Sequence, residues 1–268
     1  MPKVIFITGI SSGFGKYSAE LLANRGHIVY GTVRKESATD TKIKVLKMDL
    51  TDLSSIKSAI NFVLQKEGRI DVVINNAGML LAGPVEITPP EDFKLQMETN
   101  FTGLVHVIQA VLPSMRNQRK GTIINISSIA GLTGLPFQGF YSASKFAIEG
   151  LSEALRMELK AFNIKVVVIN PGDFQTNNTI NRIKILETGL ENPYKEQFLK
   201  TISIIEKTEK NGWPPEILAR KLCRIVECEK PKPRYIIGKL LDRLSVILKP
   251  ILPDQWYSNF VGMFYGIK

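Results

Sequence analysis

Short apolar runs alternate with amphipathic segments between residues 3 and 169. The runs are rich in β-branched residues and apolar on both faces, which is typical of buried parallel strands. They span residues 3–8, 28–33, 43–48, 70–75, 121–127 and 164–169. The amphipathic segments have the length of right-handed crossover helices and span residues 15–25, 54–65, 100–116 and 141–162. This alternation predicts an α/β fold with a doubly wound parallel sheet, in which ligands bind at the carboxyl ends of the strands.

The pattern changes after Pro171. Residues 173–212 are polar and rich in Asn, Lys and Glu, and we interpret them as a helical lid or substrate loop. We predict a helix over 216–228, a last strand within 231–238 and an amphipathic helix that begins a C-terminal extension over 239–268. Because no repeat or linker divides the chain, we expect a single domain over residues 1–268 with about seven strands.

The composition is that of an ordinary globular protein, with 268 residues, of which 44% are hydrophobic and 22% charged. No secretion signal and no apolar stretch of the roughly 18 to 20 residues that span a bilayer is present, which predicts a cytoplasmic protein. Cys223, Cys228, His27 and His106 are too few and too isolated for a disulfide framework or a metal site, so we expect no metal. The net charge of +10 is spread along the chain, which favours solubility over nucleic-acid binding as its role.

A glycine-rich segment follows the first predicted strand and opens the first predicted helix. It reads Thr8-Gly9-Ile10-Ser11-Ser12-Gly13-Phe14-Gly15. Glycines allow the main chain to turn tightly and to approach a pyrophosphate, while the N-terminus of the helix supplies N–H groups and partial positive charge. The segment therefore predicts a dinucleotide site that includes Gly9, Ser11, Ser12, Gly13, Phe14 and Gly15.

The residues after the second strand bear on the choice of dinucleotide. NAD enzymes usually offer an acid here to the ribose hydroxyls, but this chain has Arg34 and Lys35. Arg34 can bind a 2′-phosphate through a charge-assisted fork, helped by Lys35 and Ser11. We therefore favour NADP(H), with NAD(H) as the alternative cofactor and a solvated surface charge as the alternative role of Arg34.

Asp49 and Leu50 follow the third strand and complete the predicted adenosine end of the site. Asp49 is placed to accept a hydrogen bond from the adenine amino group. The alternative is a helix-capping role, which is more natural for Thr51 or Asp52.

Tyr141 and Lys145 lie four residues apart, on one face of the helix that follows the fifth strand. We expect the Lys145 charge and an oxidised nicotinamide to favour the Tyr141 phenolate and so to bring its pKa closer to the range of general acid–base catalysis. Such a pair also arises by chance in helices. Ser128, on the loop after the fifth strand, and Asn100, which we expect to begin a nearby helix, make the arrangement specific.

TGISSGFG, Asn75-Asn76-Ala77-Gly78, Asn100, Ser128, YSASK and Asn170-Pro171-Gly172 together resemble the short-chain dehydrogenase/reductase family over about residues 3 to 176. The spacing GxxxGxG is similar to that of its single-domain branch, which has a Rossmann-type fold. The resemblance implies a catalytic tetrad of Asn100, Ser128, Tyr141 and Lys145. Ser128, rather than the strand-end residue Ser127, is chosen for its separation from Tyr141.

The resemblance also implies a role for each of these residues. Tyr141 would transfer a proton to or from the substrate oxygen, and Ser128 would stabilise charge on that oxygen. Lys145 would hold the ribose hydroxyls, and Asn100 would anchor a water of the proton relay. Further cofactor contacts are implied at the adenosine and pyrophosphate end for Asn76, Ala77 and Gly78, and near the nicotinamide for Pro171, Gly172 and Thr176.

Within the family, the chain looks most like the 17β-hydroxysteroid and retinol dehydrogenase-like subgroup, which implies a lipophilic ketone or alcohol as substrate. The predicted lid adds apolar residues that fit such a substrate, namely Ile180, Ile183, Ile185, Leu186 and Phe198. The resemblance also implies a homodimer or homotetramer. One alternative is a catalytically silent NADP(H)-binding regulatory protein. Another is a protein that contacts membranes peripherally through its aromatic C-terminal segment. If this segment does not contact a membrane, we expect it to pack over the cleft or at a subunit interface.

Overall fold

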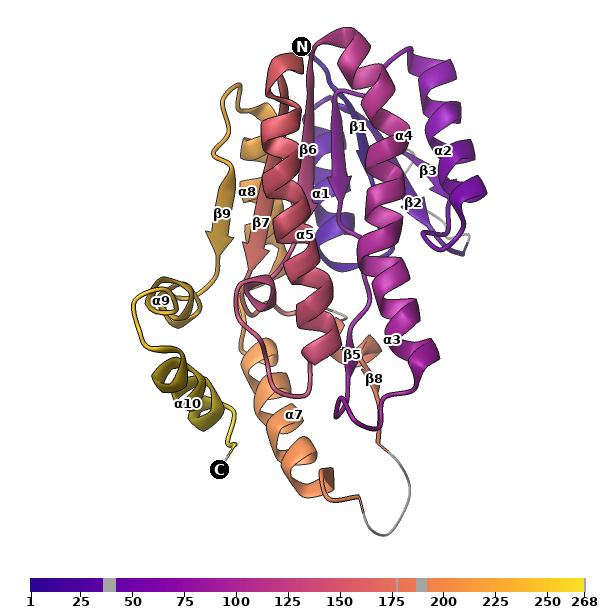
Figure 1. The fold of residues 1–268 in the computed structure, drawn as a ribbon. Helices are drawn as coiled ribbons and strands as arrows, with labels where there is room; N and C mark the ends of the chain where they lie inside the picture. Colours follow the sequence, from indigo (N-terminus) through magenta and orange to yellow (C-terminus); the bar gives the residue numbers. More distant parts are fainter. Residues whose placement is uncertain (36–41, 177, 187–191, 268) are drawn as a thin grey trace.

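The computed structural model describes residues 1–35, 42–176, 178–186 and 192–267. Within them the chain forms a seven-stranded parallel sheet in the order β3-β2-β1-β4-β6-β7-β9 (Figure 1). The strands are β1 (Val4–Ile7), β2 (Ile28–Val33), β3 (Ile43–Lys47), β4 (Val72–Asn75), β6 (Gly121–Ile126), β7 (Ile164–Pro171) and β9 (Arg234–Ile237). The strand order reverses between β1 and β4. This is the doubly wound sheet that the alternating pattern predicts.

Helices cover both faces of the sheet (Figure 1). One face carries α2 (Leu53–Glu67), α4 (Gly103–Gln118) and α5 (Gly139–Glu158). The other carries α1 (Gly13–Asn24) and α8 (Pro215–Glu227). In β1, Val4 and Phe6 belong to the core on the first face, and Ile5 and Ile7 to the core on the second. Since all four are fully buried, the strand has to be apolar on both sides.

The remaining elements lie outside this sheet and the helices that cover it. Figure 1 shows α7, α9 and α10 beyond the carboxyl ends of the strands. A small parallel sheet consists of β5 (Leu81–Ala82) and β8 (Ile183–Lys184). The helices are α3 (Pro90–Met97), α6 (Asn178–Asn181), α7 (Lys195–Lys210), α9 (Leu240–Leu248) and α10 (Asp254–Phe264). Short turns of helix are η1 (Glu98–Thr102), η2 (Ile129–Gly131) and η3 (Lys160–Phe162).

One element differs from the sequence-based expectations, and two regions that were predicted to be helical are now defined in detail. Asn100 does not begin a helix but lies in η1, a π-helical turn between α3 and α4. Sequence analysis missed α3, because its polar residues show no clear helical period, and so placed the start of the helix at Asn100. The weakly patterned lid contains α7, a helix of 16 residues, while its positions 177 and 187–191 lie outside the described residues. The C-terminal extension continues beyond α9 into a second helix, α10.

Candidate active site

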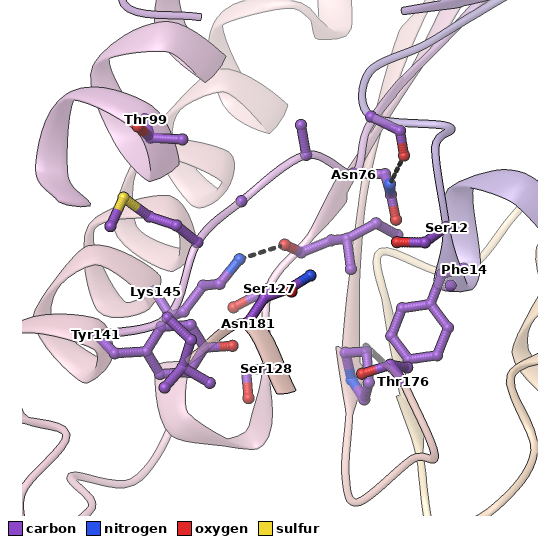
Figure 2. A pocket seen from close by; sticks show the side chains of 18 of the residues that line it. Ser12, Phe14, Asn76, Thr99, Ser127, Ser128, Tyr141, Lys145, Thr176 and Asn181 are labelled. Carbon is purple, nitrogen blue, oxygen red and sulfur yellow. Dashed lines mark hydrogen bonds between the residues drawn. The ribbon is translucent and has the colours of Figure 1, made fainter. Parts of the chain in front are cut away.

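A cleft with a volume of about 630 Å³ opens at the carboxyl ends of the strands, beside the point where the strand order reverses (Figure 2). Most of the predicted site residues line it: Gly9, Ser11, Ser12, Gly13, Phe14, Arg34, Asp49, Leu50, Asn76, Ala77, Gly78, Ser128, Tyr141, Lys145, Pro171, Gly172 and Thr176. Gly15 and Asn100 do not line the cleft, because each lies behind a residue that does. The loops that follow six different strands therefore converge on one cavity.

The loop between β1 and α1 needs glycine at two positions for steric reasons. Gly9 has φ +72°, and a Cβ there would lie 2.7 Å from the Cβ of Ala77. A Cβ on Gly15 would lie 2.0 Å from the carbonyl oxygen of Gly9, so Gly15 supports the loop from beneath instead of facing the cleft. Ser12 precedes α1 without capping it through its side chain, and the first turn of α1 holds no acid. The exposed N–H groups and the helix dipole suit a bound pyrophosphate.

Asn76 fixes this loop to the end of β4. Its Nδ2 donates to the carbonyl oxygens of Thr8 (3.0 Å) and Gly9 (2.8 Å), and its main-chain N–H donates to the Thr8 hydroxyl (3.0 Å). Figure 2 shows the side chain between the glycine loop and the cleft. The predicted contact with the cofactor is therefore combined with a structural role that sequence analysis did not identify.

The residues predicted to select NADP(H) lie at the adenosine end. Arg34 is exposed, lines the cleft and makes no ion pair within the described part of the chain. Ser11 also lines the cleft, whereas Lys35 is not among its lining residues. A cation at the end of β2 fits a bound 2′-phosphate.

Asp49 and Leu50 both line this end of the cleft, but Asp49 also has an internal role. Its Oδ1 accepts hydrogen bonds from the main-chain N–H (2.9 Å) and the hydroxyl (2.8 Å) of Thr51. Capping of α2 falls to Asp52, which accepts from the N–H groups of Ser54 and Ser55. Asp49 is thus oriented toward the adenosine end without serving as the helix cap.

Tyr141, Ser128 and Lys145 meet in the middle of the cleft (Figure 2). The Ser128 hydroxyl accepts from the N–H of Ala130 (3.1 Å) and interacts with the Tyr141 side chain. The Lys145 Nζ donates to the carbonyl oxygen of Ile126 (2.9 Å) and lies 5.7 Å from the centre of the Tyr141 ring. By contrast, the Ser127 hydroxyl is buried against Gly131, where a Cβ would be 2.5 Å away, and has no hydrogen-bond partner among the described residues.

Burial controls the titration of this pair. It raises the pKa of Tyr141 to about 12, although the interaction with Ser128 acts in the opposite direction. Burial also lowers the pKa of Lys145 to about 8, against the attraction of Glu149. Sequence analysis expected Lys145 and an oxidised nicotinamide together to bring the Tyr141 pKa closer to the working range; within the protein itself, desolvation acts in the opposite direction and outweighs the interaction with Ser128. Tyr141 therefore keeps its proton at neutral pH, as a proton donor requires.

Asn100 is buried behind Gly78 and makes hydrogen bonds with two parts of the chain. Its side chain exchanges hydrogen bonds with the main chain of Met79 (2.8 and 3.0 Å) and donates to the Ser144 hydroxyl (3.1 Å). A Cβ on Gly78 would lie 3.2 Å from Asn100 Oδ1 and 3.9 Å from Lys145 Nζ. Asn100 therefore joins the loop after β4 to α5 and lies close to Lys145.

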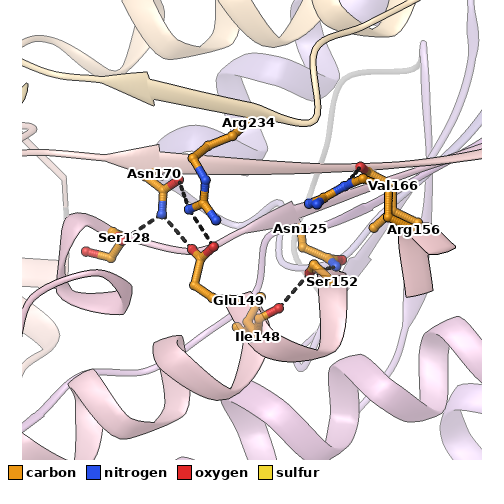
Figure 3. Close-up of polar contacts among 9 residues, drawn as sticks. All are labelled: Asn125, Ser128, Ile148, Glu149, Ser152, Arg156, Val166, Asn170 and Arg234. Carbon is orange, nitrogen blue, oxygen red and sulfur yellow. Dashed lines mark hydrogen bonds and ion pairs between the residues drawn. The ribbon is translucent and has the colours of Figure 1, made fainter. Parts of the chain in front are cut away.

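A polar network supports the Ser128 loop from behind (Figure 3). Asn170 donates to the carbonyl oxygen of Ser128 (2.9 Å) and to Glu149 (2.6 Å). Arg234 pairs with Glu149 (2.6 Å) and donates to Asn170 (3.1 Å). The network ties β7, β9 and α5 to the loop that carries Ser128. Sequence analysis missed Glu149 and Arg234, because no local signal links a charge in mid-helix to one on the last strand.

The other end of the cleft is formed by the lid and the C-terminal extension. Ile183 and Ile205 line it together with Tyr265, which follows α10. Two acids, Asp173 and Glu209, line it as well. Burial and the nearby charge of Asp242 raise the pKa of Asp173 to about 6.

The aromatic C-terminal segment has two sides. Tyr257 hydrogen-bonds Thr133 (2.7 Å) and Tyr265 lies in the cleft, so one side packs over the substrate end, as sequence analysis considered. Trp256, Phe260 and Phe264 remain 69%, 48% and 46% exposed. Across the described residues, no helix has both the length and the apolarity to cross a membrane, and no cluster of His, Cys, Asp or Glu suits a metal ion.

Known proteins are similar to this chain in sequence and in fold. A model of the short chain dehydrogenase family matches residues 3–185. The chain is 47% identical to a 3-ketodihydrosphingosine reductase of Bacteroides thetaiotaomicron over 267 residues, which cover 100% of this chain and 99% of that protein. It is 33% identical to an NADPH-dependent 3-dehydrocapnine reductase of Ornithobacterium rhinotracheale over 264 residues, which cover 91% and 92% of the two chains.

A solved short-chain dehydrogenase from Streptomyces avermitilis has a TM-score of 0.84 and 29% identity to this protein, with complete coverage of both chains. The family match covers more than half of the chain, and the curated relatives match almost their whole length. The protein therefore belongs to the short chain dehydrogenase family and is an oxidoreductase with the fold that binds a nicotinamide cofactor.

Proposed function

We propose that this enzyme uses NADPH to reduce a lipophilic ketone to a secondary alcohol. The observation that carries the proposal is the convergence of Ser128, a protonated Tyr141 and Lys145 in one cleft that begins at the glycine loop. A buried, neutral phenol is suited to giving a proton to a carbonyl oxygen. NADPH, when bound, supplies the hydride that completes the reduction.

Each wall of the cleft has a role in this proposal. The glycine loop and the N-terminus of α1 hold the pyrophosphate, and Arg34 with Ser11 binds the 2′-phosphate. Lys145 holds the ribose hydroxyls, and its positive charge stabilises the negative charge that develops on the substrate oxygen. Ser128 donates to that oxygen, Tyr141 protonates it, and Asn100 keeps Lys145 and the loop after β4 in position.

The proposed substrate is a long-chain 3-keto lipid. The end of the cleft away from the glycine loop is lined by apolar side chains, including Leu80, Leu135, Ile183 and Ile205. The two relatives described above are named as reductases of 3-ketodihydrosphingosine and 3-dehydrocapnine. An apolar lining and relatives that act on keto lipids support the same substrate class.

The first test is oxidation of NADPH and of NADH by the purified protein with a panel of ketones, spanning 3-keto lipids, steroids, retinoids and small sugars. The proposal expects turnover of a long-chain ketone with NADPH. Binding of NADPH without turnover of any ketone would favour a catalytically silent regulatory protein on the same fold. Failure to bind either cofactor would overturn the proposal.

We further propose that the enzyme works in the cytoplasm and touches membranes peripherally. Apolar residues on α9 and α10 are exposed at Leu240 (69%), Leu241 (67%), Trp256 (69%) and Met263 (76%), beside basic residues such as Arg243. Pelleting with anionic liposomes tests this surface. The variant Trp256→Ser should pellet less than the wild type, and equal pelleting would contradict the proposal.

A homodimer or homotetramer is proposed from the family resemblance, with α4 and α5 packing against a second subunit. Met157 on α5 is 70% exposed and gives this face an apolar contact point. The mass in solution, measured by light scattering, tests the proposal, and a monomer at micromolar concentration would overturn it.

A further inference from the structure

A buried amide with an unused donor lines the cleft close to Tyr141. Gln138 immediately precedes α5 and lies three residues before Tyr141, and only 3% of it is exposed. Its Nε2 has no hydrogen-bond partner within the described residues. Buried donors without partners are rare in folded proteins, because they lose their bonds to water and gain nothing in return. A ligand in the cleft would supply the missing acceptor.

The main chain holds Gln138 rigidly in this position. Its N–H donates to the carbonyl oxygen of Leu135 (3.1 Å), and its own carbonyl oxygen accepts from Ser142 (2.8 Å). The Ser142 hydroxyl in turn accepts from the N–H of Leu135 (3.2 Å). These hydrogen bonds occupy the main-chain N–H and carbonyl groups of Gln138. Its side chain is therefore the part that is left to bind a ligand.

The preceding residue, Phe137, is in a conformation that bulky residues avoid. Its φ is +58°, in the left-handed region. The conformation is maintained by a hydrogen bond from Gly83 to its carbonyl oxygen (2.8 Å) and by edge-to-face packing of its ring on Phe198 (5.4 Å). Strained residues that the surroundings hold in place occur preferentially at functional sites. Here the contacts that hold Phe137 also fix the start of α5, and with it the positions of Gln138 and Tyr141.

The charges around this end of the cleft restrict what Gln138 can bind. Asp173 and Glu209 line the cleft, whereas the lysine in its lining, Lys145, already donates to Ile126. The buried Arg182 pairs with Glu209, but Asp173 faces a second acid, Asp242. In a chain of net charge +10, this end is locally acidic. An anionic group would be repelled there, whereas a hydroxyl or an amino group would not.

We propose that Gln138 determines substrate specificity by donating a hydrogen bond from Nε2 to a neutral oxygen, such as a hydroxyl, that lies close to the reacting ketone. The preferred substrate is then a long-chain ketone with an uncharged or cationic polar headgroup, as opposed to a plain ketone or a keto acid. This inference rests on the proposed function, because it names the polar group that the same site recognises.

The test compares three ketones of equal chain length: 2-amino-1-hydroxyoctadecan-3-one, octadecan-3-one and 3-oxooctadecanoate. Wild-type protein should prefer the first by kcat/KM. Gln138→Leu should lower the ratio of kcat/KM for the first ketone to that for the second by at least about tenfold, mainly through KM, because one substrate hydrogen bond is lost. Gln138→Met keeps the length of the side chain and should have the same effect. Gln118→Leu, the same change at a half-buried position at the end of α4 that does not line the cleft, is the matched control and should leave the ratio unchanged.

Stability separates this role from a structural one. An apolar side chain of similar shape removes an unpaired buried donor, so Gln138→Leu should unfold at the wild-type temperature or above it. Equal loss on all ketones, or a lower unfolding temperature with an unchanged ratio, would overturn the inference while leaving the proposed function intact. If the wild type binds NADPH but reduces none of the ketones, the proposed function fails and the inference fails with it.

Discussion

The two ends of the cleft are built in different ways. At the glycine-loop end, the lining residues directly follow strands. Hydrogen bonds to the main chain hold them in place, such as the one from the Asn76 side chain to the carbonyl oxygen of Gly9. At the other end, the lining comes from α7, from the residues after β7 and from the C-terminal extension, which are far apart in the sequence. Local turns position the side chains at the first end, whereas those at the second end are positioned by long-range packing. This difference predicts that substitutions at the first end affect catalysis or cofactor choice, and that those at the second affect substrate choice and stability.

The largest effect is expected where the two ends meet, at Tyr141. Tyr141→Phe removes the hydroxyl beside Ser128 but keeps the ring. We expect kcat to fall by roughly 100- to 10,000-fold, the usual contribution of a general acid. NADPH affinity, measured by fluorescence titration, should stay within about twofold, since the ring is retained. Substantial residual turnover would remove Tyr141 from the proposed mechanism.

The network behind Ser128 should show its effect mainly as stability. Glu149→Ala would leave Arg234 and Asn170 without their carboxylate partner in a mostly buried site. We expect the free energy of unfolding to fall by roughly 2–4 kcal/mol, because breaking a buried pair leaves the other charge uncompensated. Urea denaturation measures this loss. Glu153→Ala, at an exposed position on the same helix, should cost far less, and equal losses would show that the network adds nothing.

Arg34 tests whether cofactor choice belongs to the glycine-loop end alone. For Arg34→Ala we expect the Kd for NADPH to rise roughly 10- to 100-fold, the value of one charge-assisted hydrogen bond, and the Kd for NADH to change little. Lys35→Ala is the matched control, since Lys35 does not line the cleft. Equal weakening of NADH and NADPH binding would show that Arg34 does not contact a 2′-phosphate.

The same difference explains how far the sequence could predict the molecule. The strands and the glycine loop are specified by residues within one strand–turn–helix unit, so their positions follow from local pattern. Tyr141 and Lys145 lie one helical turn apart, and both line the cleft as expected. Local pattern also indicated that the site lies at the carboxyl ends of the strands, because the strand–helix alternation predicts a doubly wound sheet.

Features that depend on tertiary contacts were not predicted. The pKa of Tyr141 depends on burial by residues from several elements, and the sequence suggested only the neighbouring charges. Asn100 was expected to begin a helix but lies in a π turn, which has no period of its own in the sequence. Of the apolar residues expected in the substrate lid, Ile183 lines the cleft but Ile180 is 83% exposed, since the packing of the lid decides which side faces inward.

The smallest effect, and the one most specific to the substrate end, concerns Asp173. Burial and Asp242 raise its pKa from 3.8 to about 6, so the folded protein binds a proton more tightly than the unfolded chain, and stability falls as pH rises from about 4 to 6. Asp173→Asn cannot ionise and should avoid this loss. At pH 7 it should gain roughly 1 kcal/mol, discounted for partial exposure, or about 2–4 °C in Tm. The gain should disappear below about pH 4, where the wild-type carboxyl is protonated in both states. Glu229→Gln, the same chemical change at an exposed site, should show no such dependence. A gain that is the same at pH 4 and pH 7 would mean that Asp173 carries no electrostatic strain, and the acidic character of the substrate end would then need another origin.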